Sequence, residues 1–531
     1  MDFDDMLEEL GELGKYQITT YILVCLPVFF GAANSLSYVF TAGIPNYRCL
    51  IPECEDPEST TYDVPWTKWA IPDESSSQIL DSKSHLCDRF VANETASNGT
   101  CFRELFTNKI ATCSEWVFDH SERTIVNDWN LTCFENQWKL SFVGTTHFAG
   151  IIVGSGLFGV LADRYGRKKI FIICTLIMGL SGIGQVVSPE YVTFDIMMFI
   201  NAMGTAGVYP LAFIIGVEMV GKRKREITGI VLNYFYAIGE AVVAPIAWYT
   251  KDWVLLQLIV SAPAILFFVY YWIIPESVRW LLANKKREKA KGIVCRAAEV
   301  NNVTLSESLM DSFKKSFSDD KEDVPEEGTK LLFVMKTTLK SKKLVLRLLI
   351  IYFIWAVNAF VFYGLSVNST SMSGNKYINF ALVSLVEIPG YTLAWVSIQK
   401  VGRRLSLVGS LLLCGLTCTL TLFVPADMTW GVIVLFLTGK LGVTSAFGVV
   451  YVHTAEMLPT IIRSGGVGSA STMARFGALL APFVPLLGNY VEPLPMLLFG
   501  GVAVAAGMLA LKLPETLGIK LPETVEEAEN L

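Results

Sequence analysis

The sequence predicts an all-α membrane protein with twelve transmembrane helices in two halves of six, and two observations support this. Of its 531 residues, 52% are hydrophobic and only 17% are charged, which is unlike the composition of soluble proteins. The apolar residues also gather in blocks of about 20, the length with which a helix crosses ~30 Å of hydrocarbon. We expect the spans at residues 18–42, 138–161, 170–188, 193–216, 227–249, 253–273, 344–366, 377–399, 405–424, 430–452, 466–488 and 492–512.

Short charged motifs between the apolar blocks occur twice, about 238 residues apart. Glu218 and Arg225 have the same spacing of seven as Glu456 and Arg463. The turn after the second block, YGRKK, is repeated as VGRRL, and the IPES after the sixth block is repeated as LPET. A duplicated set of spans is the usual plan of a secondary transporter, because two halves move about a site held between them.

The distribution of basic residues predicts the orientation of the chain. The segment before the first block is acidic and has a single lysine, so it lacks the basic region of a cleaved signal peptide. Two short loops, 163–169 and 221–226, each hold four basic residues, and by the positive-inside rule they are cytoplasmic. The expected units are a cytoplasmic N-terminus (1–17), an N-terminal half (18–273) with a large extracellular loop (43–137), a cytoplasmic linker (274–343), a C-terminal half (344–512) and a cytoplasmic tail (513–531).

The expected outer loop has the composition of a secreted domain. It holds three N-x-T acceptors for glycosylation, Asn93, Asn98 and Asn130, and six of the eleven cysteines. Three disulfides are expected in an oxidising compartment, although six cysteines allow fifteen pairings. The alternative is that the thiols stay free and the acceptors are unused. The cysteines are Cys49, Cys54, Cys87, Cys101, Cys113 and Cys133.

A glycine-rich second block leads into the motif GxxxDRxGRK. Asp163 is expected to cap the helix that follows and to pair with arginine, while Gly166 permits the tight turn. Breakable ion pairs on this face are suited to biasing two packings of the halves, as alternating access requires. The alternative is that these charges only set the topology. The candidate gating residues are Asp163, Arg167, Glu218, Arg225, Glu276, Arg279, Arg403, Glu456 and Arg463.

Several motifs together resemble one family. GxxxDRxGRK is the signature turn of the major facilitator superfamily. The cysteine-rich loop, PESVRWLL, VEIPGYTLAW, GKLGVTSAF and YVHTAEMLPT make the whole chain resemble the organic cation, anion and zwitterion transporters of animals. The carnitine/zwitterion branch is the most similar, and STMARFGALLAPFV is similar to the organic anion branch as well. The resemblance implies substrates with a quaternary or protonated amine, carboxylates, or both.

Four charged residues stand well inside predicted spans, where a charge costs on the order of 2.5–3.5 kcal/mol and seldom persists without a partner or a function. They are Glu240, Glu387, Lys440 and Arg475, two of each sign, which suits a molecule that carries both charges. The resemblance implies that cation carriers have an aspartate where Arg475 stands, whereas anion and carnitine carriers have an arginine. An arginine holds a carboxylate through two parallel hydrogen bonds. The alternative is an ion pair of Arg475 with Glu387 or Glu240.

Aromatic residues on the same spans are the expected partners of an ammonium group, which gains roughly 0.5–2 kcal/mol over a ring face. Packing against helices or lipid is the alternative for each single ring. The candidate wall consists of Trp355, Phe362, Tyr363, Tyr209, Tyr236, Tyr377 and Phe447. The resemblance also assigns Asn34 and Glu456 to a sodium site, but Met178 stands where a glutamine is expected. Methionine offers no hard oxygen, so sodium coupling is doubtful, and no other cofactor is expected.

The motifs that are missing narrow the function. The chain has no GxxxxGK[ST] phosphate loop, no His/Cys cluster with metal spacing and no nucleophile elbow, so nothing supports an enzyme, a metal centre or a nucleic-acid partner. A sugar-type facilitator shares DRxGRK but not the intramembrane charges. We expect a plasma-membrane carrier, monomeric in function, that moves organic cations or zwitterions such as carnitine-like amines; an organic anion exchanger is the alternative. Trp355, Phe362 and Glu240 are expected to face the ammonium end of the substrate, and Arg475 and Lys440 its carboxylate.

Overall fold

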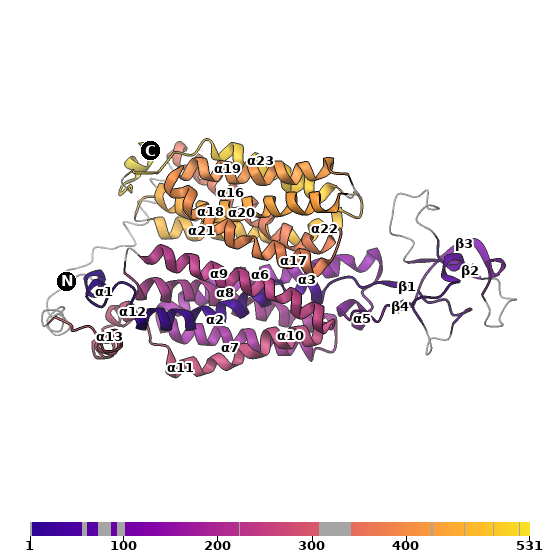
Figure 1. The fold of residues 1–531 in the computed structure, drawn as a ribbon, viewed down its shortest axis with the longest axis horizontal. Helices are drawn as coiled ribbons and strands as arrows, with labels where there is room; N and C mark the ends of the chain where they lie inside the picture. Colours follow the sequence, from indigo (N-terminus) through magenta and orange to yellow (C-terminus); the bar gives the residue numbers. More distant parts are fainter. Residues whose placement is uncertain are drawn as a thin grey trace.

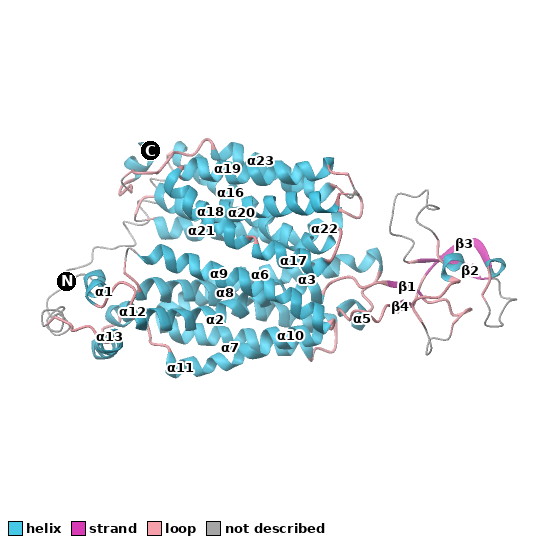
Figure 2. Ribbon diagram, viewed as in Figure 1, coloured by secondary structure: helices cyan, strands magenta, loops and turns pink. Residues whose placement is uncertain are grey.

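The protein is a bundle of long helices with a small disulfide-linked segment at one end (Figures 1 and 2). Both chain termini lie at the opposite end of the bundle. We call these two ends the disulfide end and the terminal end. The computed structural model describes residues 3–55, 61–72, 87–92, 101–221, 224–306, 341–425, 428–460, 462–491, 493–519 and 521–530.

The N-terminal half supplies six of the predicted spans, and they form the indigo-to-magenta half of Figure 1. The last of these spans is helical throughout but tightens to a 3₁₀ helix around Pro263, which removes one backbone donor. The elements are α2 (Lys15–Leu36), α3 (Tyr38–Thr41), α6 (Cys133–Tyr165), α7 (Arg167–Val186), α8 (Tyr191–Met219), α9 (Arg225–Thr250), α10 (Trp253–Ser261), η4 (Ala262–Val269) and α11 (Tyr270–Ile273).

The C-terminal half supplies the other six spans, drawn from orange to yellow in Figure 1. Across the described residues, eleven helical segments are long and apolar enough to cross a membrane, and a twelfth apolar helix, α23, is slightly shorter. The twelve predicted spans are therefore confirmed. The elements are α16 (Lys342–Asn368), η5 (Ser369–Ser371), α17 (Lys376–Leu385), α18 (Glu387–Lys400), α19 (Arg403–Leu420), η6 (Thr421–Phe423), α20 (Thr429–Met457), α21 (Arg463–Leu480), η7 (Ala481–Phe483), α22 (Val484–Leu487) and α23 (Leu494–Ala510).

The eighth span is broken in its middle, between α17 and α18. Pro389 lies in the first turn of α18 and has no backbone N–H to donate to Leu385, so the helix is interrupted there. The first residue after the break is Glu387, which is completely buried. The break therefore brings a charged side chain into the interior at a point where the helix is irregular.

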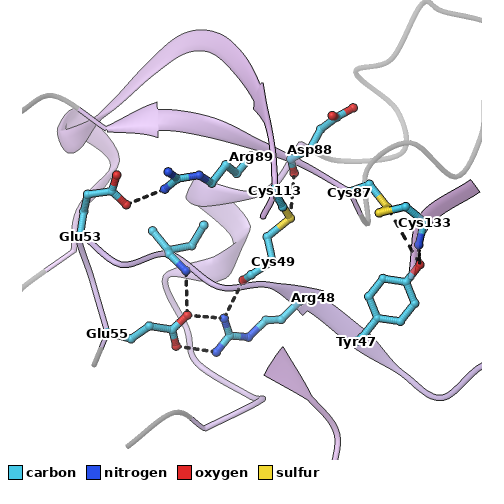
Figure 3. Close-up of a disulfide and its surroundings, with 11 residues drawn as sticks. Tyr47, Arg48, Cys49, Glu53, Glu55, Cys87, Asp88, Arg89, Cys113 and Cys133 are labelled. Atoms are coloured by element: carbon cyan, nitrogen blue, oxygen red, sulfur yellow. Dashed lines mark hydrogen bonds and ion pairs between the residues drawn. A yellow bond between two sulfur atoms is a disulfide. The ribbon is translucent and has the colours of Figure 1, made fainter. Parts of the chain in front are cut away.

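The disulfide-linked segment is held together by two antiparallel strand pairs and three disulfides. Figure 3 shows the surroundings of Cys49, Cys87, Cys113 and Cys133 in this segment. Its six cysteines pair as Cys49–Cys113, Cys54–Cys101 and Cys87–Cys133, so the predicted number of disulfides is confirmed. The third disulfide ties the segment to the first residue of α6. The elements of this segment are β1 (Tyr47–Cys49), α4 (Thr67–Ala70), β2 (Asp88–Ala92), η2 (Arg103–Leu105), β3 (Phe106–Thr112), β4 (Trp116–Phe118) and α5 (Ile125–Trp129).

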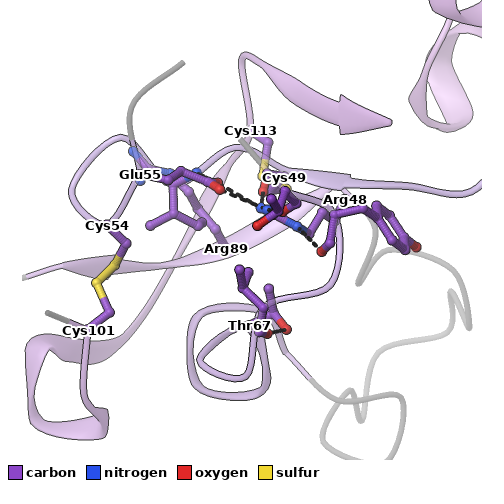
Figure 4. Close-up of polar contacts among 12 residues, drawn as sticks. Arg48, Cys49, Cys54, Glu55, Thr67, Arg89, Cys101 and Cys113 are labelled. Carbon is purple, nitrogen blue, oxygen red and sulfur yellow. Dashed lines mark hydrogen bonds and ion pairs between the residues drawn. A yellow bond between two sulfur atoms is a disulfide. The ribbon is translucent and has the colours of Figure 1, made fainter. Parts of the chain in front are cut away.

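A buried ion pair organises the core of this segment (Figure 4). The Arg48 guanidinium donates to both oxygens of the Glu55 carboxylate, at 2.7 and 2.8 Å, and to the carbonyl oxygen of Tyr62 at 2.8 Å. The two charged side chains are only 6% and 8% exposed. Such two-point pairing satisfies both charges, which a pair removed from water requires.

Short helices cover the terminal end. They are α1 (Phe3–Glu9), α12 (Val278–Ala283), α13 (Arg287–Asn301) and α24 (Val525–Asn530). The apolar faces of α1 and α13 meet in a small cluster around Met6 and Val294. The Asn301 amide then donates to the carbonyl oxygens of Leu10 and of the Gln17 side chain, at 3.0 and 2.9 Å. The linker between the halves is thus docked onto the N-terminal segment.

Candidate functional site

Two of the four charges predicted inside the membrane form an ion pair. Lys440 on α20 lies 2.8 Å from the Glu387 carboxylate on α18, and both side chains are 0% exposed. The Lys440 ammonium also donates to the Phe362 carbonyl oxygen at 3.1 Å and to the Ser366 hydroxyl at 2.8 Å. Its nitrogen lies 3.3 Å from the centre of the Phe362 ring. Lys440 is therefore occupied by protein groups and not available for the substrate carboxylate that we expected it to hold.

Glu240 on α9 completes a group that we call the central charge cluster: Glu240, Glu387 and Lys440. Its side chain is also 0% exposed, and Glu387, Lys440 and Tyr236 are its neighbours. Neither carboxylate oxygen of Glu240 makes a hydrogen bond of ordinary geometry with a described residue. The cluster joins α9 of the N-terminal half to α18 and α20 of the C-terminal half, so it lies at the interface between the halves.

The central charge cluster lies about halfway through the membrane. Glu240 stands ten residues before the end of α9 at the disulfide end, and Lys440 stands eleven residues after the start of α20 at that end. At 1.5 Å per residue these positions are roughly 15 Å deep, which is half of a ~30 Å hydrocarbon core. A charge at that depth is expensive unless it is paired or used.

Four of the predicted aromatic side chains form a continuous group beside this cluster, together with Tyr451, which was not predicted. Trp355 contacts Tyr451 at 4.3 Å between ring centres, and Phe362 contacts Phe447 at 5.4 Å and Tyr363 at 5.1 Å. We call these five residues the aromatic cluster. Trp355 is 1% exposed and Phe362 is 2% exposed, whereas Tyr451 is 43% exposed. The rings therefore run from the buried charges toward a more open region.

Two of the remaining predicted wall residues, Tyr209 and Tyr236, lie next to Tyr363 of the aromatic cluster, and the third, Tyr377, lies apart from it. Tyr209 and Tyr236 contact one another at 5.6 Å on the N-terminal half, and the Tyr209 hydroxyl donates to Asn233 at 2.6 Å. Tyr377 lies at the disulfide end, stacked on Phe40 at 5.4 Å. Tyr377 therefore belongs to the contact that closes this end and not to a wall around the central charges.

Asn34 is fully engaged by protein groups. Its amide nitrogen donates to the carbonyl oxygens of Phe30 and Val260, at 3.0 and 3.2 Å, and its oxygen accepts from the Ser261 hydroxyl at 2.7 Å. Glu456, the other residue assigned to sodium, is at the terminal end of α20 in the other half. In this conformation the two residues do not form one ion site.

Arg475 on α21 differs from the other three membrane charges. Its side chain is half-buried, and it makes no ion pair or hydrogen bond with the part of the chain that the structure describes. The alternative that we considered, an ion pair of Arg475 with Glu387 or Glu240, is not formed. Glu387 makes its ion pair with Lys440 instead. The Arg475 guanidinium keeps its hydrogen-bonding capacity for a carboxylate.

The two halves are joined at the disulfide end. Glu122, just before α5, makes an ion pair with Lys376 and accepts a hydrogen bond of 2.5 Å from the Tyr377 hydroxyl. Asn489 donates to Gln137 at 2.6 Å, and Phe40 packs edge-on against Phe380 at 5.0 Å. These contacts close the interface on the disulfide side of the central charge cluster.

At the terminal end α9 and α18 still join the halves, because the Trp395 indole donates to the Glu226 carboxylate at 3.4 Å, whereas parts of α6 and α21 are uncovered. The Asp163 side chain, near the end of α6, is 75% exposed. Gly159 on α6 and Gly465 and Gly468 on α21 have open space where a side chain would stand. Further along the interface, the hydroxyls of Tyr234 and Thr392 still meet at 2.6 Å. Contacts thus join the halves at the disulfide end and between α9 and α18, whereas α6 and α21 are uncovered at these glycines near the terminal end.

The candidate gating charges pair within each half. In the N-terminal half Arg167 lies 2.9 Å from Asp163 and 3.8 Å from Glu218. In the C-terminal half Arg403 donates to both oxygens of Glu456, at 3.0 and 2.9 Å. In each half the arginine of the GR turn is thus an ion-pair partner of the glutamate in the repeated motif, Arg167 of Glu218 and Arg403 of Glu456.

Two further glutamates cap the helices that follow the GR turns. Glu276 accepts from the backbone N–H of Lys168 in α7 at 3.0 Å, and Glu515 accepts from the first two backbone N–H groups of α19 at 2.8 and 3.1 Å. A carboxylate at a helix N-terminus is favoured by the unpaired N–H groups and the helix dipole. Burial works to raise the pKa of Glu515, but its backbone hydrogen bonds outweigh this and hold the pKa below its usual value. We had expected Asp163 to cap α7, but the structure shows that Glu276 caps it.

Of the other candidate gating residues, Arg463 makes its hydrogen bonds close to its own position in the chain. Arg463 donates to the Leu458 carbonyl oxygen and the Thr460 hydroxyl at 3.4 and 3.3 Å, within its own turn. Arg225 is the first residue of α9, and Arg279 is exposed on α12. Among the glycosylation candidates, Asn130 is exposed at the end of α5, while Asn93 and Asn98 lie outside the described residues.

Comparisons with known proteins show the family to which the chain belongs. The sequence profile of the family described as "Sugar (and other) transporter" matches residues 92–528. An organic cation transporter protein of Drosophila melanogaster is 34% identical over 535 residues, which cover 100% of this chain and 95% of the relative. The organic cation/carnitine transporter 2 of Homo sapiens is 31% identical, covering 99% of this chain and 94% of the relative. This chain therefore belongs to the family described as "Sugar (and other) transporter", and within it to the group of the organic cation and carnitine transporters.

The membership confirms both the resemblance and the class: this transporter comes from a family of carriers, not of enzymes. Its fold is also found among solved structures. The inward open conformation of the xylose transporter XylE from E. coli matches it with a TM-score of 0.55 at 18% identity, covering 74% of this chain and 89% of that one. A likeness at this identity shows the major facilitator fold alone.

Sequence reasoning missed two residues that the structure brings to the interface. Tyr38 on α3 lies near both Tyr363 and Glu240, and its hydroxyl has no hydrogen bond to a described residue. Glu122 in the disulfide-linked segment binds the opposite half. The first is an ordinary tyrosine at the end of an apolar block, and the second is one acid among many in a polar loop. Neither carries a signal in the sequence that distinguishes it from its neighbours.

Proposed function

We propose that this transporter carries small organic cations, and zwitterions that contain an ammonium group, across the plasma membrane by alternating access. One observation carries the proposal: the Glu240 carboxylate is fully buried at mid-membrane with no hydrogen bond to a described residue, next to an aromatic cluster. A buried carboxylate without its own counter-ion attracts a cation, and ring faces hold an ammonium group without hydrating it. The relatives named above are called organic cation and carnitine transporters.

The proposed orientation puts the disulfide end outside the cell and both termini inside. Three disulfides in one short segment favour an oxidising compartment, and the basic turns at the terminal end favour the cytoplasm. In this orientation the observed arrangement is inward-facing, since the contacts of Glu122 and Gln137 close the outer side. One chain contains the complete interface between the halves, so a monomer suffices for function.

Arg475 extends the substrate class from cations to zwitterions. It is half-buried and forms no ion pair with a described residue, so its guanidinium is able to bind a carboxylate at two points. Lys440, the other membrane cation, is neutralised by Glu387. A carrier of organic anions, the alternative function, would then have to bind its substrate next to an excess of buried carboxylate, which disfavours it.

Uptake into cells that express the protein tests this function. We expect saturable uptake of tetraethylammonium and of carnitine, and none of an aromatic anion such as p-aminohippurate, each measured with and without sodium. Replacing sodium by lithium tests sodium coupling at a nearly unchanged membrane potential, whereas raising external potassium at constant sodium tests the effect of the membrane potential. Uptake of the anion alone would contradict the proposal.

Arg475→Ala separates the two substrate classes within one variant. Hydrogen bonds to a charged group contribute about 1.5–3 kcal/mol, so the carnitine affinity should fall roughly ten- to a hundredfold. Tetraethylammonium has no carboxylate, so its uptake by the same variant serves as the matched control for folding and surface expression. Equal loss of both substrates with normal surface expression would remove the carboxylate role from Arg475.

A further inference from the structure

The central charge cluster does not balance its own charge. Among the described residues of the membrane spans, the charged side chains that are 0% exposed are Glu240, Glu387 and Lys440. Lys440 is paired with Glu387 at 2.8 Å. With both carboxylates ionised, the buried group would therefore hold one negative charge in excess. The oxygens of both carboxylates lack a hydrogen bond of ordinary geometry to a described residue, and of the two only Glu387 lies within ion-pair distance of Lys440.

The groups that surround Glu240 do not supply a second positive charge. The charged neighbours are Glu387 on α18 and Lys440 on α20, and the others are tyrosines. Arg475 lies on α21 and makes no ion pair with a described residue. The tyrosines around the carboxylates are Tyr38 on α3, Tyr236 on α9 itself, Tyr363 on α16 and Tyr391 on α18.

An excess charge in such a place is removed by a proton or by a cation. Taking an ion out of water costs several kcal/mol even after the protein relaxes, and a buried carboxylate without a partner is neutralised instead. Two carboxylates that share one site keep one proton between them for the same reason. When an organic cation is bound, Glu240 is favoured in its ionised form, because a protonated Glu240 would leave the site with one positive charge in excess.

We propose that Glu240 holds a proton in the empty transporter and releases it when an organic cation enters, so that one cation is exchanged for one proton. This inference rests on the proposed function and names its coupling ion. On the side of entry the O–H bond of Glu240 breaks, and the proton passes to the water from which the cation came. On the other side the cation leaves and the carboxylate takes a proton from that solution. No net charge crosses the membrane in this cycle.

Purified protein in liposomes tests the exchange. Tetraethylammonium is the probe, because a quaternary ammonium ion carries no proton of its own. The membrane potential is held at zero by equal potassium on both sides and valinomycin. With the interior about one pH unit more acidic than the outside, one-for-one exchange accumulates the probe about tenfold, and without a pH difference it does not accumulate.

Glu240→Gln keeps the shape of the protonated side chain, but the amide cannot release a proton. We expect the variant to take up tetraethylammonium more weakly, because the carboxylate that attracts the cation is gone. The uptake that remains should be independent of the pH difference and should follow the membrane potential when the valinomycin clamp is released. Asp195→Asn on α8 is the matched control: it neutralises another carboxylate within a span, one that is half-buried and bound to Thr146 at 2.9 Å. This control should accumulate the probe like the wild type. Accumulation by Glu240→Gln equal to that of the wild type would overturn the proposal.

A measurement on the wild type decides the question if the variant does not fold. Tetraethylammonium added to the purified protein in weakly buffered detergent solution should release about one proton per cation bound, read with a pH-sensitive dye. Uptake that follows the membrane potential but not the pH difference would refute proton exchange and leave the proposed function standing. Absence of both tetraethylammonium and carnitine transport would instead refute the proposed function itself.

Discussion

In the N-terminal half, Arg167 reaches Asp163 and Glu218 at the terminal end, and in the C-terminal half Arg403 reaches Glu456 at the matching place. The central charge cluster shows no such correspondence. Shifted by the same interval of 238 residues, three of the membrane charges fall on buried alanines: Lys440 on Ala202, Arg475 on Ala237 and Glu240 on Ala478.

The difference separates two tasks. The two terminal-end clusters repeat because each half needs the same connection between its helices if the halves are to move as units. The central charges occur once because a substrate lies between the halves and does not share their symmetry. We therefore assign the repeated residues to the movement of the halves and the single ones to the choice of substrate.

Lys440→Met should have the largest effect, because it removes the one cation of the central charge cluster and leaves two buried carboxylates. Breaking a buried pair by removing one partner costs about 3–5 kcal/mol. We expect a large drop in the unfolding temperature of the purified protein, followed by tryptophan fluorescence in detergent.

The double variant Lys440→Met with Glu387→Gln is the control for this prediction. It removes both charges, so most of the lost stability should return. If Lys440→Met alone were as stable as the wild type, the charge pair would not be buried as the structure describes.

The spans and the number of disulfides were predictable from the sequence, because each depends on a property of a short segment. A block of about 20 apolar residues is long enough to span a membrane wherever it lies in the fold. The disulfide pairing was not predictable, since Cys49 joins Cys113 across two strand pairs whose register six cysteine positions do not determine.

The members of the central charge cluster were found in the sequence, but not their partners. The depth of Glu387 and Lys440 follows from counting residues along one helix. Their contact depends on the packing of α18 on α20, which helical spacing does not reveal. The same holds for Glu276, whose role as the cap of α7 requires that the end of the sixth span return to the start of the third.

A smaller and equal effect is expected in both halves from Gly166→Ala and Gly402→Ala. Both glycines have positive φ, +112° and +102°, with an extended ψ, a region that is nearly restricted to glycine. A Cβ would also collide with the capping carboxylates of Glu276 and Glu515. Each change should cost on the order of 1–3 kcal/mol, visible as a lower unfolding temperature.

Two other glycines are matched controls for these turns. Gly156 on α6 and Gly409 on α19 have nothing within 4 Å of the point where a Cβ would stand, and both lie inside helices. Alanine there should leave stability unchanged or raise it by up to about 1 kcal/mol. A large loss at one turn and none at the other would show that the two halves are not built alike at this point.

The smallest effects are expected from Glu218→Gln and Glu456→Gln, and they should differ. Glu456 accepts two hydrogen bonds from Arg403 and a third, of 2.6 Å, from the Thr516 hydroxyl. Glu218 lies 3.8 Å from Arg167, which keeps its contact with Asp163. Partly exposed ion pairs contribute about 0–1 kcal/mol, whereas hydrogen bonds to charged groups contribute about 1.5–3 kcal/mol. The unfolding temperature should therefore fall more for Glu456→Gln. Equal falls in the unfolding temperature would mean that the shorter contacts of Glu456 add no stability, and that the helices within each half are connected equally well at the terminal end.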